Sequence, residues 1–195
     1  LEYISNYADD GGFSRWSTLT TAEHAGTHFD TPSHWTSGQD FPDGTTETIS
    51  VDRFIAPGCV LDYTFEVKEN PDFILTKDHI LKWEDKYGII EPGSWVLFQS
   101  GWSDRFEDPD KFINMDEDGC HSPGPDPEAV KLMIERDVCG FGTETIGTDY
   151  GAASKFDPPF PLHYFMHGAN KFGLASLNNL DKLPPRGSVI ITPPL

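Results

Sequence analysis

The segment from His24 to His34 has the greatest density of side chains that could perform chemistry. Three of the seven histidines, His24, His28 and His34, fall in it together with the carboxylate of Asp30. Imidazole and carboxylate groups are ligands for Zn²⁺, Mn²⁺ and Fe²⁺. We therefore predict a divalent metal site formed by His24, His28 and Asp30, with His34 as a further imidazole beside the ion.

The spacing of the three predicted ligands requires a turn. In an extended segment, residues of even number point to one face of a sheet, so His28 and Asp30 lie on the same side, about 6–7 Å apart. His24 is the exception, because four extended residues span about 13 Å, which is too far for one shared ion. The chain must therefore turn between His24 and His28, either at Gly26 or through one helical turn.

His34 is expected to come from a loop, because Pro32 cannot donate a hydrogen bond to a neighbouring strand. Three protein ligands leave positions on an ion for water, which is what hydrolysis requires. Cysteine is absent from this segment, which removes the case for a purely structural zinc site. The alternative interpretation is a set of hydrogen-bonded histidines near a turn.

A second pair of histidines, His163 and His167, is spaced by one helical turn and would share a helix face. The preceding segment, residues 158–161, holds three prolines and is rigid enough to form the wall of a site. From the residues alone, the pair has three interpretations. It forms a local metal site, it supports the first cluster, or it is a polar helix face.

The composition indicates one globular domain over residues 1–195. The formal net charge is −18, and only 14 residues are Lys or Arg, which argues against nucleic acid and anionic membranes as partners. No apolar run is as long as a membrane span, so we expect a soluble protein, with the cytoplasm slightly favoured over secretion. Cys59, Cys120 and Cys139 form no zinc or disulfide pattern, although a Cys120–Cys139 bridge stays open.

The pattern of apolar runs and capping residues predicts an α/β domain with a mixed sheet and flanking helices. Short buried strands are expected at residues 59–63, 95–98, 173–177 and 188–191. Helices are expected from Thr76 to Tyr87, from Asp126 onward, and over about 162–170. Residues 102–126, which are rich in Asp, Pro and Gly, are expected to form a long loop.

The first cluster also carries a family resemblance. Its pattern, His-x-Gly-Thr-His-x-Asp-x-Pro-x-His, resembles the signature of the metal-dependent cyclase family, which includes kynurenine formamidase and isatin hydrolase. Less specific similarity extends over much of the chain, at residues 101–102, 147–149 and 174–180. The resemblance implies a swivelling β/β/α fold, usually in a homodimer, and hydrolysis of an amide by a metal-bound hydroxide.

The resemblance also implies roles for individual residues. His24, His28 and Asp30 match the metal ligands of the family, and His34 matches its proton-transfer residue. His163 matches a histidine that binds a second metal in the two-metal members.

The chain departs from the family pattern in three places. Ala175 stands where the two-metal members carry Glu, so a second ion is not expected, and His163 is left to act on substrate or water. Gln99 stands where many members have Arg, which puts recognition of a substrate carboxylate there in doubt. The short run before His24 and the ending Pro193–Leu195 suggest a chain truncated at both ends.

We predict a metal-dependent hydrolase of an amide or lactam bond in a small aromatic substrate, with one Mn²⁺ or Zn²⁺ ion. His34 would act as general base and then as general acid. The side chains suggested for an aromatic pocket are Trp16, Phe29, Trp35 and Phe160. The alternatives are a metal-binding protein without turnover, a lactone or ester hydrolase, and a structural module that keeps a metal clip.

Overall fold

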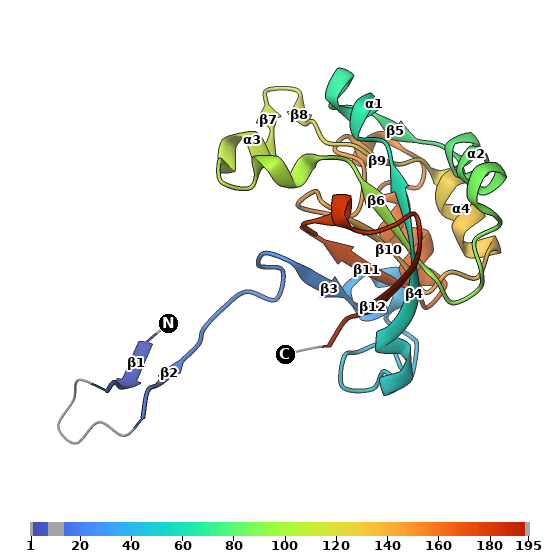
Figure 1. The fold of residues 1–195 in the computed structure, drawn as a ribbon. Coiled ribbons are helices and arrows are strands. Elements are labelled where there is room, and N and C mark those ends of the chain that lie inside the picture. Colours follow the sequence, from blue (N-terminus) through green and yellow to red (C-terminus); the bar gives the residue numbers. More distant parts are fainter. Residues whose placement is uncertain (1, 8–13, 194–195) are drawn as a thin grey trace.

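A six-stranded mixed sheet forms the centre of the computed structural model, which describes residues 2–7 and 14–193. The strands lie in the order β12, β4, β6, β10, β11 and β3 (Figure 1). Their bounds, in that order, are Arg186–Ile191, Ile55–Asp62, Trp95–Gln99, Gly140–Thr143, Phe172–Ala175 and His28–Asp30. The predicted mixed sheet with flanking helices is confirmed, although the sequence pattern did not reveal β10.

The four central strands run parallel, and the two outer strands run antiparallel to their neighbours. In the outer pair of β3 and β11, His28 lies opposite Ala175 and Asp30 lies opposite Gly173. The carboxyl ends of parallel strands share one edge of a sheet, and ligands of open α/β sheets bind there. Since β3 is antiparallel, its first residue, His28, lies at this same edge.

Helix α2, Lys77–Tyr87, has the bounds that its capping residues predict. Thr76 and His79 form a capping box at its start, in which each side chain accepts a hydrogen bond from the other residue's backbone. Gly88, with φ of +94°, ends the helix.

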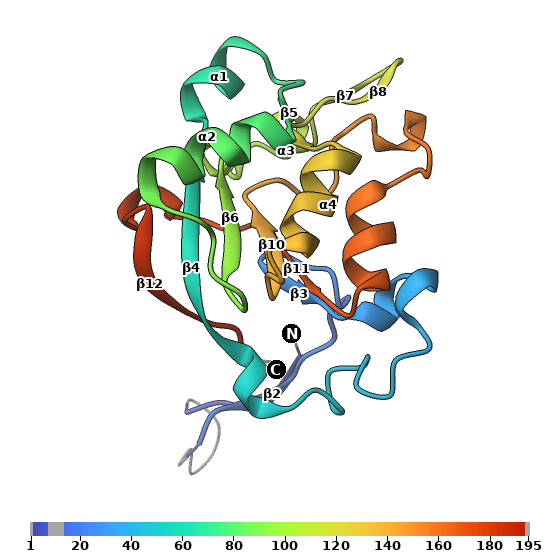
Figure 2. The ribbon, with the colours of Figure 1, turned by 90° about the vertical axis from the view of Figure 1, so that its right-hand side faces the viewer.

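Helix α4, Pro127–Glu135, begins after Asp126, whose Oδ1 accepts the backbone N–H of Ala129 at 2.7 Å. The third predicted helix is a π-helix over Leu162–His167, shorter than the expected range of 162–170. Helices α2 and α4 and this π-helix lie over the same face of the sheet (Figure 2). That face therefore positions His163 and His167 relative to the strands.

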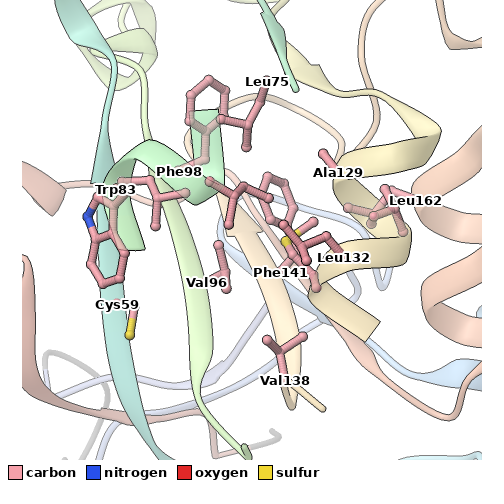
Figure 3. Packing of buried hydrophobic residues seen from close by; sticks show 14 of the residues in the cluster. Cys59, Leu75, Trp83, Val96, Phe98, Ala129, Leu132, Val138, Phe141 and Leu162 are labelled. Carbon is pink, nitrogen blue, oxygen red and sulfur yellow. The ribbon is translucent and has the colours of Figure 1, made fainter. Parts of the chain in front are cut away.

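Two apolar layers pack against the two faces of the sheet. The layer under the helices packs strand residues such as Phe98 and Phe141 against Leu132 and Leu162, all of which are at most 2% exposed (Figure 3). The opposite layer includes Phe54, Ala56, Val60, Trp95, Leu97, Phe172, Leu174 and Leu180. A sheet covered on both faces explains why its parallel strands read as nearly continuous apolar runs.

The region expected as a long loop, residues 102–126, holds short elements instead. These are a 3₁₀ turn at Trp102–Arg105, α3 at Pro109–Ile113, and the strands β7 at Met115–Asp116, β8 at Gly119–Cys120 and β9 at Gly124–Pro125. β9 pairs in parallel with β5, Ile74–Leu75, which follows the short helix α1, Thr64–Glu69. The remaining 3₁₀ turns are Pro32–His34, Thr36–Gly38, Val51–Phe54, Ala153–Lys155 and Leu180–Lys182.

An arm precedes the body of the fold. It consists of β1, Glu2–Ser5, and β2, Trp16–Thr18, which pair with each other and project away from the sheet (Figure 1). In the part of the chain that the structure describes, no helix is long and apolar enough to cross a bilayer. The ending noted in the sequence falls partly outside the described residues, which stop at 193.

The three cysteines are free thiols, so the structure does not contain the Cys120–Cys139 bridge that the sequence left open. Burial raises the pKa of the Cys139 thiol to about 12. A thiol with so high a pKa is neutral at pH 7 and has a packing role.

Candidate metal centre

The structure brings the three predicted ligands together at the start of β3. A turn at residues 23–27 reverses the chain before the strand, and Gly26 adopts φ of +63° in it. The Nδ1 atom of His24 lies 2.9 Å from Oδ1 of Asp30, and the Nε2 atom of His28 lies 3.6 Å from the same oxygen. All three donor atoms fall within 4.8 Å of one another. The turn at Gly26 thus brings His24 back to His28 and Asp30, as the spacing of the three residues requires.

A bound divalent ion explains the arrangement of the three side chains better than hydrogen bonds among them do. Asp30 is only 3% exposed, and its Oδ1 atom has no hydrogen-bond partner among the described residues, although two imidazole nitrogens approach it. A buried carboxylate oxygen without a partner is costly, and a metal ion removes that cost. Two imidazole nitrogens and one carboxylate form a donor set for first-row divalent metals.

The ring of His28 is held in the orientation that a metal ligand needs. Its Nδ1 atom donates a hydrogen bond to the carbonyl of Gly26 at 2.8 Å, which leaves the lone pair of Nε2 facing Asp30. A hydrogen bond from the second ring nitrogen to a backbone carbonyl is the common support of metal-binding histidines. The loop before β3 is fixed as well, because Thr27 Oγ1 donates to the carbonyl of Ser176 at 2.5 Å.

His34 lies beside the predicted ligands on the 3₁₀ turn Pro32–His34, as expected for a residue that follows the strand. Its ring centroid is 4.1 Å from that of His24 and 5.4 Å from that of His163. Partial desolvation lowers the pKa of His34 from 6.5, in spite of the opposing effect of Asp30. At neutral pH its imidazole is therefore mainly neutral and able to accept a proton.

His163 of the second pair reaches the cluster, and the ring of His167 lies 6.1 Å from that of His34. A ring nitrogen of His163 falls within 4.8 Å of donor atoms of Asp30 and His34. His167 is fully buried, its Nδ1 donates to the carbonyl of Lys171 at 3.0 Å, and burial lowers its pKa to about 4. Of the three interpretations, a polar helix face is therefore excluded, because neither side chain faces solvent.

The sequence did not single out the partner of His163 as a site residue. Asp149, buried to 8% exposure, accepts the Nδ1 hydrogen of His163 and the backbone N–H of Leu162. The signal that could have found it is the Gly147-Thr148-Asp149 run, which belongs to the weaker part of the family similarity.

Two of the four aromatic residues suggested for a substrate pocket lie next to the cluster. The ring of Trp35 lies 4.8 Å from that of His163 and 5.7 Å from that of Phe160. Phe160 has φ of +54° and remains 37% exposed. A large side chain in this backbone region is unusual, and such strain often marks a functional position.

The other two aromatic residues lie elsewhere. The ring of Phe29 packs against Phe54 and Phe172 in the apolar layer, because alternate residues of β3 point to opposite faces and Phe29 lies between two ligands. Trp16, on β2 of the arm, is 60% exposed, and the arm projects away from the sheet (Figure 1). We therefore remove both residues from the pocket formed within one chain.

Two positions where the sequence departs from the family pattern have different surroundings. Ala175 is fully buried directly opposite His28, so it lies beside the predicted metal ligands. Gln99 lies three strands away from β3, at the end of β6, where its Nε2 donates weakly to Thr64 Oγ1 at 3.4 Å. It lines a separate cavity between β4 and α2. The structure therefore does not place Gln99 at the metal centre.

Comparison with known proteins identifies the class to which this fold and site belong. Residues 4–150 match the sequence profile of the Cyclase family, described as putative cyclase, and the chain belongs to that family. The resemblance seen in the histidine motif is thus confirmed. Among individual relatives, the isatin hydrolase of Roseibium aggregatum is 47% identical over all 195 residues, which cover 74% of that protein.

Solved structures of isatin hydrolases also match this chain closely. An isatin hydrolase bound to the product analogue thioisatinate superposes with a TM-score of 0.96 at 47% identity, over 100% of this chain and 74% of the other. Isatin hydrolase A from Ralstonia solanacearum gives 0.95 at 46% identity, over 98% and 74%. A potential metal-dependent hydrolase with cyclase activity, at 21% identity and a TM-score of 0.61 over 92% and 84%, shares the fold.

Proposed function

We propose that this chain is a metal-dependent hydrolase that opens the lactam ring of isatin or a closely similar aromatic compound. The observation that carries the proposal is the convergence of His24, His28 and Asp30, with His34 beside them, in a chain 47% identical to an isatin hydrolase along its whole length. The chain would then belong to the hydrolases that act on C–N bonds other than peptide bonds.

The residues of the chain divide the work of this reaction. His24, His28 and Asp30 would hold a divalent ion, whose Lewis acidity would lower the pKa of water and polarise a carbonyl. His34 accepts one proton from the attacking water, whose oxygen forms a bond to the lactam carbon. The C–N bond then breaks, and His34 returns the proton to the leaving nitrogen. The products are an aromatic amine and a carboxylic acid on one molecule, and the acid releases the second proton of the water to solvent to become a carboxylate.

The aromatic wall beside the cluster fits a flat substrate. Trp35 and Phe160 lie at 5.7 Å between ring centroids, and Trp35 also contacts the ring of His163. Aromatic rings stack or meet edge to face with centroids about 4.5–7 Å apart, so a bicyclic lactam can pack against them. Stacking here would present the carbonyl to the side where Asp30 and His34 lie.

We further propose one ion per chain, Mn²⁺ or Zn²⁺. Imidazole and carboxylate ligands suit both metals, and no thiolate lies among the ligands to favour zinc. Ala175 offers no ligand atom at the position where we expect the two-metal members to carry Glu.

We also propose that the chain forms a homodimer through its arm. The arm projects from the body (Figure 1) and exposes Tyr3, Ile4 and Trp16 at 51%, 56% and 60%. Apolar side chains gathered on an exposed element favour contact with another protein surface. Size-exclusion chromatography with light scattering should give twice the chain mass of 21.8 kDa. A mass of 21.8 kDa at micromolar concentration would contradict the dimer.

The test of function is turnover with defined metals. The protein, stripped with chelator and reloaded with Mn²⁺ or Zn²⁺, should open isatin, and His34→Ala should bind the ion normally but lose at least about 100-fold in kcat. His121→Ala, a histidine bound to Asp72 and Asp116 on the β7–β8 side, is the matched control and should keep full activity.

Three outcomes would overturn the proposal in different ways. Metal binding without turnover of any amide, lactam or ester would indicate a binding protein. Faster turnover of a matched lactone or aryl ester than of isatin would indicate an esterase that uses the same residues. Turnover of N-formylkynurenine in preference to isatin would move the substrate to an open-chain amide.

A further inference from the structure

Asp149 joins the start of the π-helix to the imidazole that this helix carries. Its Oδ1 atom accepts the backbone N–H of Leu162 at 2.8 Å. Its Oδ2 atom accepts both the backbone N–H of His163, at 3.2 Å, and the Nδ1 hydrogen of the same residue, at 2.5 Å. One buried carboxylate therefore fixes a helix start and a ring together.

The hydrogen bond to the ring distinguishes Asp149 from an ordinary helix cap. Asp126 and Asp108, the side-chain caps of α4 and α3, accept a backbone N–H three residues further along the chain. Asp149 is 13 residues from the helix it caps and also binds a side chain. A cap alone would not need the second contact.

The contact determines which nitrogen of His163 is available to the site. A carboxylate accepts hydrogen bonds, so Nδ1 of His163 carries a hydrogen, and Nε2 is the ring nitrogen left for other partners. The side chain of His163 is 13% exposed. Its ring lies 4.8 Å from that of Trp35, and one of its nitrogens is within 4.8 Å of donor atoms of Asp30 and His34. In the neutral ring, the free Nε2 atom is a hydrogen-bond acceptor.

We propose that Asp149 is a positioning residue for the reaction, which holds His163 so that its Nε2 accepts a hydrogen bond from a donor at the metal centre. This inference rests on the proposed function. Two donors have the required chemistry: the N–H of the lactam and a water molecule. Supporting residues of this kind commonly change activity by about 10- to 100-fold.

The first test measures the ring itself. Nitrogen-15 NMR of the protein loaded with Zn²⁺, a diamagnetic probe ion, should show His163 with hydrogen on Nδ1, with the resonance assigned by its loss in His163→Gln. In Asp149→Asn the side-chain carbonyl still accepts from Leu162, while the amide replaces Oδ2. The amide gives up the hydrogen bond from the backbone N–H of His163 and donates to Nδ1, so hydrogen should move to Nε2. A wild-type ring with hydrogen on Nε2 alone would overturn the proposal, whether or not the protein hydrolyses isatin.

The second test is a double-mutant cycle. Asp149→Asn and His163→Gln should each lower kcat by about 10- to 100-fold, and the double variant should be no slower than the worse single variant, because both changes remove one function. Asp85→Asn, an exposed position on α2 with the same change of charge, is the control and should be neutral. Multiplying effects in the double variant would show that Asp149 serves only the helix start.

The third test separates the two donors. If the lactam N–H is the donor, the wild type should prefer isatin to N-methylisatin in kcat/KM, and Asp149→Asn should lose most of that preference. If water is the donor, both substrates should lose kcat equally in the variant. A full preference for isatin kept in Asp149→Asn, together with unchanged kcat, would overturn the positioning role. Failure of the wild type on both substrates would instead count against the proposed function.

Discussion

Ala175 and His28 lie opposite each other in the antiparallel pair of β11 and β3. Directly opposed residues point to the same face of a sheet, with Cβ atoms about 4.5–5.5 Å apart. The side chain at position 175 is therefore a neighbour of the predicted metal ligands, and here it is a methyl group. This neighbourhood gives a direct prediction about the number of ions.

We expect one divalent ion per chain. Elemental analysis after dialysis against Mn²⁺ or Zn²⁺ should give a ratio near one, and Asp30→Asn should reduce it toward zero, because that carboxylate oxygen is the point on which both imidazoles converge. A ratio near two would mean that His163 and other residues complete a second site without help from position 175.

Removal of the ion should silence the protein without unfolding it. The predicted ligands lie at the sheet edge, while stability comes from the two apolar layers, which do not contain them. Far-UV circular dichroism should be unchanged by chelator, and Tm should fall by only about 5–10 °C relative to ion at 100 times its Kd. An unfolded metal-free chain would instead indicate the structural metal clip.

Gly26→Ala should weaken metal binding through the backbone alone. A Cβ at Gly26 would meet no heavy atom within 4 Å, so the cost is that of φ +63° for a residue with a side chain, about 1–2 kcal/mol. We expect a 5- to 30-fold rise in Kd for Mn²⁺ by calorimetry. Gly93→Ala is the control, since Gly93 has φ of +76° and is equally open but lies in the turn before β6. Equal losses of affinity in both variants would refute the role of the turn.

Glu84→Gln should destabilise the fold and leave catalysis unchanged. Glu84 is 6% exposed, forms two hydrogen bonds to Arg136 at 2.8 and 2.9 Å, and accepts the N–H of Ile90. Loss of these charged hydrogen bonds should lower the free energy of unfolding by about 2 kcal/mol at pH 7.

The pair of Glu84 and Arg136 should also make the free energy of unfolding depend on pH, with a sign that follows from the pKa of Glu84. Burial by itself raises the pKa of Glu84 and is the largest single effect. The hydrogen bonds from Arg136 and from the N–H of Ile90, together with the charges of Arg136 and Arg186, outweigh it, so the pKa lies below its usual 4.5. A lowered pKa means that the stabilisation is complete above pH 4.5 and is lost as the pH falls through the lower folded value. In urea titrations, the difference between wild type and Glu84→Gln should therefore shrink below pH 4.5. A difference that grows in acid would contradict the assignment.

The sequence predicted the parts of the fold that have local signals. Capping residues at Thr76 and Asp126 predicted the starts of α2 and α4, and apolar runs located β4, β6, β11 and β12. β10 was not predicted because its sequence, Gly-Phe-Gly-Thr, contains a single large apolar residue. The structure explains that composition, since a Cβ at Gly140 would lie 2.4 Å from the carbonyl oxygen of Phe172 and 2.5 Å from the ring of Trp95.

The candidate site, too, contains features that the sequence could predict and features that it could not. The even spacing of His28 and Asp30 and the turn at Gly26 were predictable, because they depend on contacts within seven residues. Asp149 was not, because only the fold brings it to His163. Phe29 shows the converse error: its type suited an aromatic pocket, but the alternation of β3 sends it into the apolar layer.

The strand that carries two of the three predicted ligands is three residues long and stands last in the order of the sheet. Fraying of those few residues would release the ion while the rest of the domain stays intact. Exchange of the ion with its surroundings is then governed by a small local opening, much easier than loss of the whole fold. Protein made under metal starvation would accumulate as a folded, inactive reserve that becomes competent as soon as the ion returns.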